Sequence, residues 1–394
     1  MILTKKQEEG LHIAIERYKN KEKYTVIGGY AGVGKSSLVK FIIEALNIDI
    51  NKVCYTAFTG KAAEVLKKKG NHNVCTLHKL LYDHFPKPEG GFFRKPKKDI
   101  PYSVVVVDEI SMAPKSLMEL LASHKCHIIC LGDPFQLPPI NKDEDNHLLD
   151  HPHIFLDEIM RQAEDSEIIQ LSMKIRKREP ISLFNGNNVK VLSKDTLNTG
   201  MLTWADQILV GTNATRQNIN NQMRALLERG SLPEDGDKVI CLRNYWDDIN
   251  ENGDSLVNGT IGYLKNPFET FYTIPRFIKA DKRKLEMISS DFIIDKNTSF
   301  NYVLVDKQLI LNGERCCDWK VAYQLGKLKN KIGDVVPKEF AYAYAITGHK
   351  SQGSEWDKVL VIEEAFPFDK TEHARWLYTT VTRASEKLVL IRNE

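Results

Sequence analysis

Three short stretches of the chain are dominated by apolar and β-branched residues, without the polar alternation of a half-exposed strand. They are residues 24–27, 104–107 and 127–131, and each is followed by glycine or acidic residues. Strands of this kind are typical of parallel sheets that are covered on both faces. Residues 38–43 have the apolar spacing of a helix. The pattern therefore predicts an α/β fold built on parallel sheets.

A different pattern begins near residue 236, where short β-type runs are separated by turn residues. Residues 261–264 and 302–305 are examples. Short strands with frequent turns favour a small barrel. A chain of 394 residues is also too long for a single ordinary core. We expect one α/β domain at 1–154, a second built from 155–233 and 334–394, and an inserted β module at 234–333.

A second interruption, residues 82–102, contains four prolines and two glycines before the 104–107 strand. It also carries Phe92 and Phe93 next to Arg94 and Lys95. Exposed aromatic side chains beside cations can stack on nucleic acid bases. A solvated loop with a hydrophobic anchor explains the same residues equally well. The sequence of this segment leaves both interpretations open.

Composition and charge narrow the class of protein. Hydrophobic residues make up 42% of the chain and charged residues 27%, as in globular proteins. The net charge is only +3, so a nucleic acid site has to be a local basic surface. No stretch resembles a signal peptide or a membrane span, and seven scattered cysteines favour reduced thiols. We therefore expect a cytoplasmic protein without a membrane partner.

One cluster of potential zinc ligands has to be weighed against core packing. His124, Cys126, His127 and Cys130 lie within seven residues of one another. Because this segment reads as a buried strand, alternate side chains point to opposite faces and do not all converge on one ion. Core packing is the preferred interpretation, and the same applies to the adjacent pair Cys316 and Cys317.

The first predicted strand leads into a glycine-rich loop and then a helix. Gly29, Gly34, Lys35 and Ser36 fill the G-x-x-x-x-G-K-[ST] pattern of a phosphate-binding loop, or P-loop. In such a loop the backbone amides and the helix N-terminus surround the phosphates, the lysine neutralises them, and the hydroxyl binds Mg²⁺. The predicted nucleotide contacts are Gly29, Ala31, Gly32, Val33, Gly34, Lys35, Ser36 and Ser37.

Polar residues follow the other two predicted strands. Asp108 and Glu109 come directly after residues 104–107, and Gln136 lies in the proline-rich turn after residues 127–131. Ligands of open α/β sheets bind at the carboxyl ends of the strands. We expect Asp108 to hold Mg²⁺, Glu109 to polarise the attacking water, and Gln136 to contact the γ-phosphate.

The order of these segments resembles the motif series of the superfamily-1 helicases. Motifs I, Ia, Ib, II and III are similar to residues 29–36, 57–63, 76–78, 108–109 and 132–139, and motifs IV, V and VI to residues 156–162, 345–356 and 377–384. Within the superfamily, residues 76–78, 256–262 and 347–353 look like the RecD/Dda type. The resemblance runs almost from end to end.

This resemblance implies an architecture and a direction of movement. It implies two RecA-like parallel-sheet motor domains, an inserted SH3-like β-barrel module and a short wedge hairpin at residues 82–102. It also implies 5′→3′ translocation, which the spacing of residues does not show.

The resemblance also assigns further residues to the nucleotide. Gln7 reads adenine, Arg161 and Arg383 reach the γ-phosphate from the second motor domain, and Glu355 touches the ribose beside Gly353. Guanidinium groups supplied by a second domain make hydrolysis depend on closure of the cleft. The catalytic set expected is thus Lys35, Glu109, Gln136, Arg161 and Arg383.

For the DNA strand, the resemblance places hydroxyl, aromatic and basic residues along a track. These are Phe58, Thr59, His78, Phe92, Phe93, Asn213, Thr347, His349 and Lys350. Such contacts bond phosphates or stack on bases and are blind to sequence. The basic run at 276–284 is a weaker candidate, because most charge runs are solvated faces.

The function expected is an ATP- and Mg²⁺-dependent DNA helicase that acts as a monomer on single-stranded DNA and on junctions of single and double strands. Single-strand-binding, replication or recombination proteins are further candidate partners. The alternatives are a DNA-stimulated translocase subunit of a recombination or nuclease complex without unwinding of its own, and a simple nucleotide switch. A switch lacks the second motor domain and its arginines. No nuclease site is recognisable in the sequence.

Overall fold

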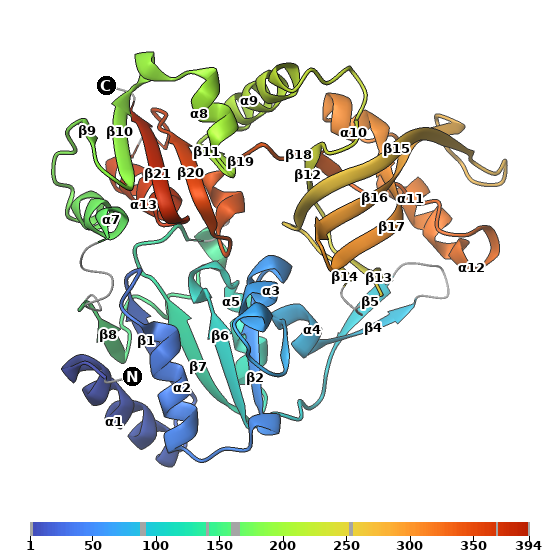
Figure 1. The fold of residues 1–394 in the computed structure, drawn as a ribbon. Coiled ribbons are helices and arrows are strands. Elements are labelled where there is room, and N and C mark those ends of the chain that lie inside the picture. Colours follow the sequence, from blue (N-terminus) through green and yellow to red (C-terminus); the bar gives the residue numbers. More distant parts are fainter. Residues whose placement is uncertain are drawn as a thin grey trace. The chain divides into compact units, whose positions relative to one another are not determined.

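The computed structural model describes residues 3–86, 92–138, 142–158, 166–251, 255–367 and 369–392. The chain divides into two compact units (Figure 1). Unit 1 comprises Met1–Tyr82, Pro96–Arg216 and Ile346–Glu394, and unit 2 comprises Asp83–Lys95 and Gln217–Ala345. The domain boundaries expected from the sequence rest on motif positions rather than on contacts, and they stay predictions.

The first sheet of unit 1 is parallel throughout and confirms the three strands predicted from the apolar runs. Its strand order is β3-β2-β6-β7-β1-β8. The strands are β1 (Tyr24–Gly29), β2 (Val53–Ala57), β3 (Val74–Thr76), β6 (Val104–Asp108), β7 (His127–Gly132) and β8 (Ile154–Leu156). The helices along this part of the chain are α1 (Lys5–Lys19), α2 (Lys35–Ala45), α3 (Gly60–Lys68), α4 (Leu77–Leu81) and α5 (Lys115–Ala122).

Strand β6 shows why a continuous apolar run belongs in this position. Val104 and Val106 pack into one core cluster, which contains the apolar residues of α2 and α3. Val105 and Val107 point the other way, into a cluster that contains those of α4 and α5. All four valines are almost completely buried. Helices therefore cover the sheet on both faces, and every position of the strand has to be apolar.

The second sheet of unit 1 has the order β19-β11-β20-β21-β10-β9. The pairs β11·β20, β20·β21 and β10·β21 are parallel, and only the short β9 is shown to run antiparallel to its neighbour β10. The strands are β9 (Phe184–Asn185), β10 (Val189–Ser193), β11 (Gln207–Val210), β19 (Ala345–Thr347), β20 (Trp356–Ile362) and β21 (Ala384–Arg392). The helices along these parts of the chain are α7 (Glu167–Lys177), α8 (Thr199–Trp204) and α13 (Lys370–Val381). Helix α9 (Asn213–Leu226) spans the boundary between the two units, which lies between Arg216 and Gln217.

Unit 2 is built on an antiparallel sheet with the order β17-β16-β15-β12-β18. Its strands are β12 (Lys238–Cys241), β15 (Ile261–Thr273), β16 (Lys284–Asp295), β17 (Thr298–Asp306) and β18 (Phe340–Tyr342), with the small pair β13 (Tyr245–Ile249) and β14 (Ser255–Leu256). Helices α10 (Lys307–Asn312), α11 (Trp319–Lys327) and α12 (Lys329–Ile332) follow β17. The sheet buries an apolar core that includes Phe292 and Phe340.

The strands of unit 2 are longer than the short runs that the sequence pattern indicated. The run at 261–264 is the start of β15, which has 13 residues, and the run at 302–305 belongs to the nine-residue β17. Beyond Leu264 most side chains of β15 are exposed or half-buried. Pairing with β16, rather than burial, extends the strand there, so an apolar pattern does not reveal its length.

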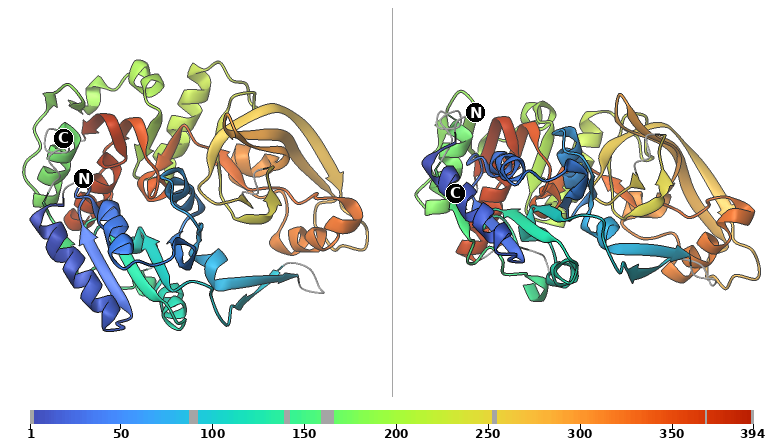
Figure 2. Two further views of the ribbon diagram at one scale, coloured as in Figure 1. Left: turned by 60° about the horizontal axis from the view of Figure 1, so that its bottom comes forward. Right: turned by 90° about the horizontal axis from the view of Figure 1, so that it is seen from below.

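The interruption that precedes β6 contains a two-stranded sheet (Figure 2). Its strands are β4 (Tyr82–Pro86) and β5 (Phe92–Pro96). The side chains of Phe92 and Phe93 lie outside the described part of the structure.

Candidate nucleotide site

The carboxyl ends of three neighbouring strands carry the candidate residues. In the first sheet β6 lies next to β7, and β7 lies next to β1. Strand β1 leads into the P-loop, β6 ends at Asp108, and β7 ends one residue before Asp133. Parallel strands place these ends at one edge of the sheet, where open α/β sheets bind their ligands. Segments about a hundred residues apart in sequence therefore form one site.

The glycines of the P-loop are required by its backbone. Gly32 and Gly34 both have φ near +78°, in the left-handed region that favours glycine. Gly34 also occupies the N-cap position of α2, so the amides of the first turn of this helix open at the end of the loop. The Lys35 ammonium donates to the carbonyls of Gly29 and Tyr30, at 2.8 Å each, and thus lies inside the loop. Ser36 is exposed at the start of the helix and Ser37 is half-buried.

Helix α1 is hydrogen-bonded to the P-loop through Gln7. Thr4 and Gln7 form a capping box, in which each side chain bonds the backbone N–H of the other residue. The Gln7 amide is buried, and its Nε2 also donates to the carbonyl of Val33 at 3.2 Å. Gln7 therefore lies against the P-loop, and the residue predicted to read adenine is also a structural cap.

The two acidic residues after β6 are held in different ways. Asp108 Oδ1 accepts from the Glu109 backbone N–H at 2.9 Å. Desolvation and the neighbouring Glu109 charge raise the pKa of Asp108 to about 6, although Lys35 acts against this. A carboxylate whose charge is poorly compensated is suited to a cation. Asp108 is thus a fitting ligand for a metal ion bound beside the P-loop.

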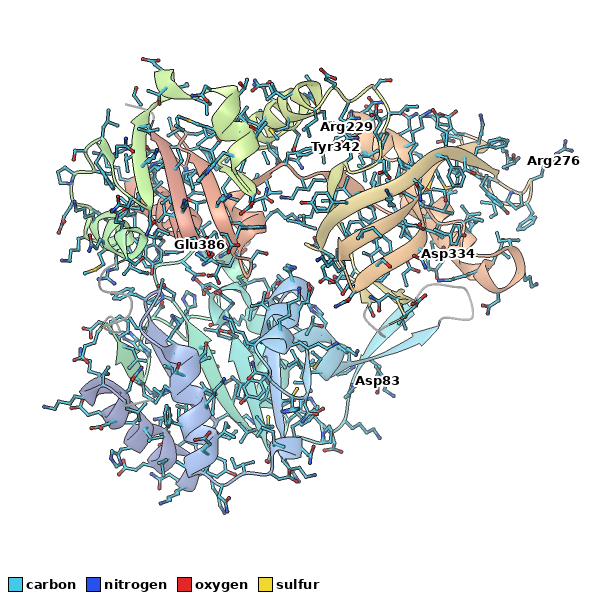
Figure 3. The ribbon with its side chains drawn as sticks, in the orientation of Figure 1. Asp83, Arg229, Arg276, Asp334, Tyr342 and Glu386 are labelled. Atoms are coloured by element: carbon cyan, nitrogen blue, oxygen red, sulfur yellow. The ribbon has the colours of Figure 1, made fainter. Side chains whose placement is uncertain are left out.

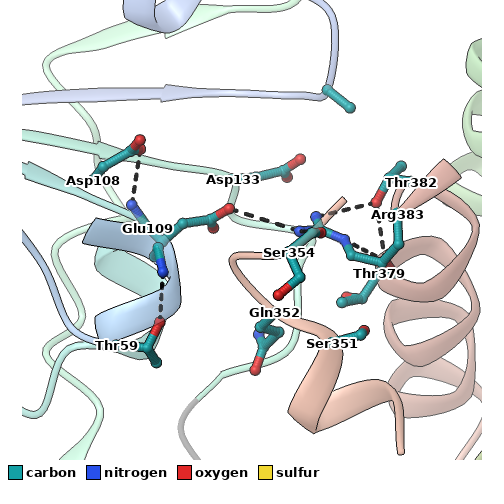
Figure 4. Close-up of polar contacts among 12 residues, drawn as sticks. Thr59, Asp108, Glu109, Asp133, Ser351, Gln352, Ser354, Thr379, Thr382 and Arg383 are labelled. Atoms are coloured by element: carbon teal, nitrogen blue, oxygen red, sulfur yellow. Dashed lines mark hydrogen bonds and ion pairs between the residues drawn. The ribbon is translucent and has the colours of Figure 1, made fainter. Parts of the chain in front are cut away.

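Glu109 faces an arginine from the second sheet. The guanidinium of Arg383 lies 3.9 Å from Glu109 Oε1, and Arg383 also donates to the carbonyls of Thr379 and Ser354 (Figure 4). With its amide nitrogen turned toward Glu109, Gln136 donates to Glu109 Oε2 at 2.9 Å and accepts from Arg383 Nη2 at 3.2 Å. The structure therefore brings together three of the predicted catalytic residues, although Arg383 lies more than 240 positions from the other two in sequence.

The loop after β7 is bonded to the second sheet at more than one point. The backbone N–H of Leu137 donates to Thr379 Oγ1 at 3.1 Å, and Gln352 Nε2 donates to the carbonyl of Leu137 at 2.9 Å. Asp133 accepts a hydrogen bond of 2.5 Å from the hydroxyl of Tyr378. The loop that carries Gln136 is therefore bonded to both α13 and the segment before β20.

The loop between β19 and β20 approaches α3 closely. Gly353 has φ +73°, and a Cβ atom there would lie 2.8 Å from Ala62 Cβ. The neighbouring Thr59 caps α3 by accepting from the Ala62 N–H at 3.2 Å. Glu355, predicted to reach the ribose, is exposed on the same loop.

Two of the predicted DNA-contact residues form an aromatic row. The ring of Phe58 lies 5.8 Å from that of His78, and His78 stacks on Tyr82 with a centroid distance of 6.2 Å. All three side chains are half-buried, so part of each ring faces solvent. The row includes Tyr82, whose position at the start of the interruption at 82–102 gave no sequence signal for this role.

The other candidates for DNA contact are placed separately. Thr347 and His349 are half-buried, Lys350 is exposed, and Asn213 is exposed at the first position of α9. Burial lowers the pKa of His349, which favours the neutral ring near pH 7. Arg161 lies outside the described residues.

His127 takes part in packing of the first sheet. Its two ring nitrogens lie 2.9 Å from Thr25 Oγ1 and 2.7 Å from the Glu22 carbonyl. Cys126 and Cys130 are buried in the core cluster that contains α4 and α5. Within the described residues, no group of three or more His, Cys, Asp or Glu side chains is arranged to hold a metal ion. A search of the same residues also finds no helix with the length and apolar character needed to cross a membrane.

Two residues that lie beside the P-loop, Tyr378 and Arg176, were not among the predicted site residues. The hydroxyl of Tyr378 accepts from the Ala31 N–H at 3.1 Å, and the guanidinium of Arg176 stacks 3.3 Å above the ring of Tyr30. Tyr378 lies within a quoted motif, so its position was a usable signal. Arg176 lies on an ordinary amphipathic helix, α7, and nothing in the sequence distinguishes it.

Comparisons with known proteins show which families and relatives the chain is similar to. An AAA domain family model matches residues 3–191, and a UvrD-like helicase C-terminal domain model matches residues 342–391. The ATP-dependent RecD2 DNA helicase of Deinococcus radiodurans is 24% identical over 397 aligned residues, covering 93% of this chain and 46% of that protein. The ATP-dependent DNA helicase Dda of Enterobacteria phage T4 is 32% identical over 151 residues, 36% of this chain and 34% of that protein. The aligned parts are less than half the length of these two relatives.

A solved structure shows the same fold. The Pif1 helicase from Bacteroides, in complex with ADP-AlF3 and single-stranded DNA, has a TM-score of 0.53 at 17% identity, covering 100% of this chain and 95% of that one. The fold and the matched families define a superfamily-1 helicase with a parallel-sheet RecA-like core, in a class of ATP-hydrolysing DNA helicases. Within that class, the aligned relatives RecD2 and Dda show that the chain resembles the RecD/Dda branch.

Proposed function

We propose that this protein is an ATP-dependent DNA helicase that moves 5′→3′ on single-stranded DNA and hydrolyses ATP between its two parallel sheets. The approach of Arg383 to Glu109 supports the position of the site, because it sets a guanidinium from the second sheet beside the acidic residues of the first. Hydrolysis then depends on the arrangement of both sheets. That dependence is what a motor requires to convert a chemical step into movement.

In this mechanism each residue of the site has its own task. Lys35 and the amides of the P-loop bind the phosphates, and Glu109 accepts a proton from the attacking water. Gln136 holds Glu109 and Arg383 together. Arg383 stabilises the negative charge that gathers on the γ-phosphate during transfer. Arg161, Gln7 and Glu355 are proposed as the additional γ-phosphate, adenine and ribose contacts.

Ser36 and Asp108 would hold Mg²⁺. The ion supplies neutralisation of the phosphate charge when it is bound. Burial and, after it, repulsion from Glu109 raise the pKa of Asp108, and a cation beside the carboxylate would favour its charged form.

Single-stranded DNA is proposed to lie along Phe58, Thr59, His78 and Thr347, with His349, Lys350 and Asn213 as further contacts. The half-exposed rings of Phe58 and His78 can stack on bases without reading sequence. We assign the hairpin of β4 and β5, with Phe92 and Phe93, to strand separation, and the antiparallel sheet of unit 2 to an SH3-like module beside the DNA.

Strand displacement tests the function and the direction together. Partial duplexes with a 5′ tail, a 3′ tail or no tail are incubated with the protein, ATP and Mg²⁺, with Lys35→Ala as the control. We expect displacement of the 5′-tailed substrate only, dependent on ATP and absent in the control. Displacement of the 3′-tailed substrate alone would reverse the proposed direction. DNA-stimulated ATP hydrolysis without displacement of any substrate would favour a translocase subunit.

A further inference from the structure

A buried tyrosine on α13 reaches across from the second sheet to the P-loop. Tyr378 is 1% exposed. Its hydroxyl accepts from the backbone N–H of Ala31 at 3.1 Å and donates to Asp133 Oδ2 at 2.5 Å. Asp133, also 1% exposed, follows β7 directly. One oxygen atom therefore joins three segments of the chain, the P-loop after β1, the loop after β7, and α13.

Both roles of this oxygen are needed for its partners to be satisfied. The hydroxyl accepts one hydrogen bond and donates another. A phenylalanine ring can do neither. Asp133 receives a second bond at Oδ1, from the Phe135 N–H at 2.9 Å. Burial raises the pKa of Asp133, so its remaining donors are all the more important for the charged form. Loss of the hydroxyl leaves a buried carboxylate and a loop amide each without one partner.

Further contacts hold the same three segments together. The ring of Phe135 packs edge-on against that of Tyr378 at 5.2 Å, and the neighbouring Thr379 accepts from the Leu137 N–H. On α7, which packs against α13, Arg176 stacks on Tyr30 of the P-loop. The P-loop residues Tyr30 and Ala31 are therefore both contacted by side chains from the second half of unit 1.

The position of Tyr378 relates these contacts to the proposed chemistry. Arg383 Nε donates to the carbonyl of Thr379, the residue directly after Tyr378. The turn of α13 that places the hydroxyl on Ala31 thus also fixes the guanidinium beside Glu109. Because both contacts come from one rigid turn, a change in the P-loop is transmitted to the distance between Arg383 and Glu109.

We propose that Tyr378 is a positioning residue for ATP hydrolysis, which sets the register of Arg383 and Glu109 relative to the P-loop through Ala31 and Asp133. It acts without touching the reacting atoms. The inference rests on the proposed function only in requiring that the chain hydrolyses ATP, and it is independent of unwinding and of direction.

The test is Tyr378→Phe, which removes the hydroxyl and keeps the ring. Steady-state ATP hydrolysis is measured with and without single-stranded DNA, and equilibrium titrations measure binding of ADP and of a non-hydrolysable ATP analogue. We expect kcat to fall about 10- to 100-fold, as misplacement of reacting groups does. We expect KM for ATP and Kd for ADP to change less than about threefold, since the loop that binds the phosphates remains.

Unit 2 offers a matched control. The hydroxyl of Tyr344 donates to Asp237 Oδ1 at 2.9 Å, and both residues are buried. Tyr344→Phe therefore removes the same kind of tyrosine–aspartate bond in unit 2, whereas the P-loop belongs to unit 1. We expect both variants to lower Tm, and only Tyr378→Phe to lower kcat.

A second variant covers the case in which Tyr378→Phe does not fold. Asp133→Asn keeps the shape of the side chain and an oxygen that accepts from Tyr378, so a smaller fall in kcat is expected with ADP binding again unchanged. In the double variant the fall should not exceed that of Tyr378→Phe alone, because both changes interrupt one chain of hydrogen bonds.

Unchanged kcat in Tyr378→Phe would overturn the proposal. So would a loss of ADP affinity as large as the loss of kcat, which would make Tyr378 a structural support of the P-loop. An equal fall of kcat in Tyr344→Phe would show that the effect of Tyr378→Phe comes from a general loss of stability. A parent protein that does not hydrolyse ATP would also overturn this inference. A parent that hydrolyses ATP without unwinding DNA contradicts the proposed function only.

Discussion

At the scale of single residues, Glu109 is held in a backbone conformation that its side chain does not favour. Its φ is +51°, in the left-handed region, at the point where β6 ends and the following turn begins. A residue held there costs on the order of 1–2 kcal/mol, which the surrounding packing has to offset. The turn separates two adjacent carboxylates, since Asp108 accepts from the chain while Glu109 meets Arg383.

Substitutions at the three charged positions should separate binding from hydrolysis. Glu109→Gln removes the proton acceptor and should lower DNA-stimulated ATP hydrolysis by at least about 100-fold. Arg383→Ala should bind an ATP analogue and hydrolyse ATP about 1,000-fold more slowly or worse. Lys35→Ala should lose affinity for the nucleotide itself, because it removes a positive charge from the phosphate site.

These outcomes are measured by ATP turnover and by titration with a fluorescent ATP analogue, with circular dichroism as the check on folding. Parental turnover in Lys35→Ala or Glu109→Gln would show that the site is assigned wrongly. Equal hydrolysis by Arg383→Ala and the parent would remove the argument for a contribution from the second sheet.

At the scale of elements, an ionic cluster ties α13 to two strands of the second sheet. Glu363, directly after β20, accepts from His373 on α13 at 3.0 Å and from Arg392 at the end of β21 at 2.8 Å. The hydrogen bond to Glu363 raises the pKa of His373 above 6.5. The pKa of Glu363 is lowered from 4.5: burial opposes this, and the bonds from His373 and Arg392 outweigh it. The cluster thus holds in place the helix that carries Tyr378.

The sign of both shifts predicts a pH dependence of stability. The contribution of His373 is complete below its ordinary pKa of 6.5 and is lost as pH rises through its higher folded value. The contribution of Glu363 is present above 4.5 and is lost as pH falls through its lower folded value. The free energy of unfolding, measured by urea titration, should therefore decrease above pH 6.5 as His373 loses its proton. The decrease should be smaller in His373→Gln. An identical slope in both proteins would exclude His373 as the cause.

At the scale of the whole molecule, the nucleotide site depends on contacts between two sheets whose strands do not pair with each other. Leu137, Asp133 and Glu109 from the first half meet Thr379, Tyr378 and Arg383 from the second. Regions that open together also share their protection against hydrogen exchange. A ligand bound to the P-loop should therefore slow hydrogen exchange in both sheets.

Hydrogen exchange with and without a non-hydrolysable ATP analogue measures this coupling. We expect slower exchange in the P-loop and in α2, and also in residues 351–355 and in α13. Strand β16 of unit 2, whose core is separate, serves as the internal reference. Protection confined to the first sheet would contradict a site shared between the two sheets.

Some elements of the fold could be predicted from the sequence, and others could not. Strands β1, β6 and β7 and the helix after the P-loop were predicted, because their burial on both faces leaves a continuous apolar pattern. The lengths of β15 and β17 were not, since their outer parts are exposed and held by pairing. The roles proposed for Gln7, Arg161 and the DNA-contact residues came from motif resemblance and stay predictions.

The sequence by itself determined the P-loop and the acidic residues at the ends of its neighbouring strands, because both depend on spacings of a few residues and on the local period of the chain. Only the tertiary structure decided that Tyr378 bonds Asp133 across 245 positions and that Arg383 faces Glu109. Such contacts follow from how two sheets pack, and no local preference of the chain encodes them. The physical reason is the separation along the sequence over which each feature is specified. Patterns over a few neighbouring residues specify helices, strands and loops, whereas contacts between these elements depend on how the whole chain packs.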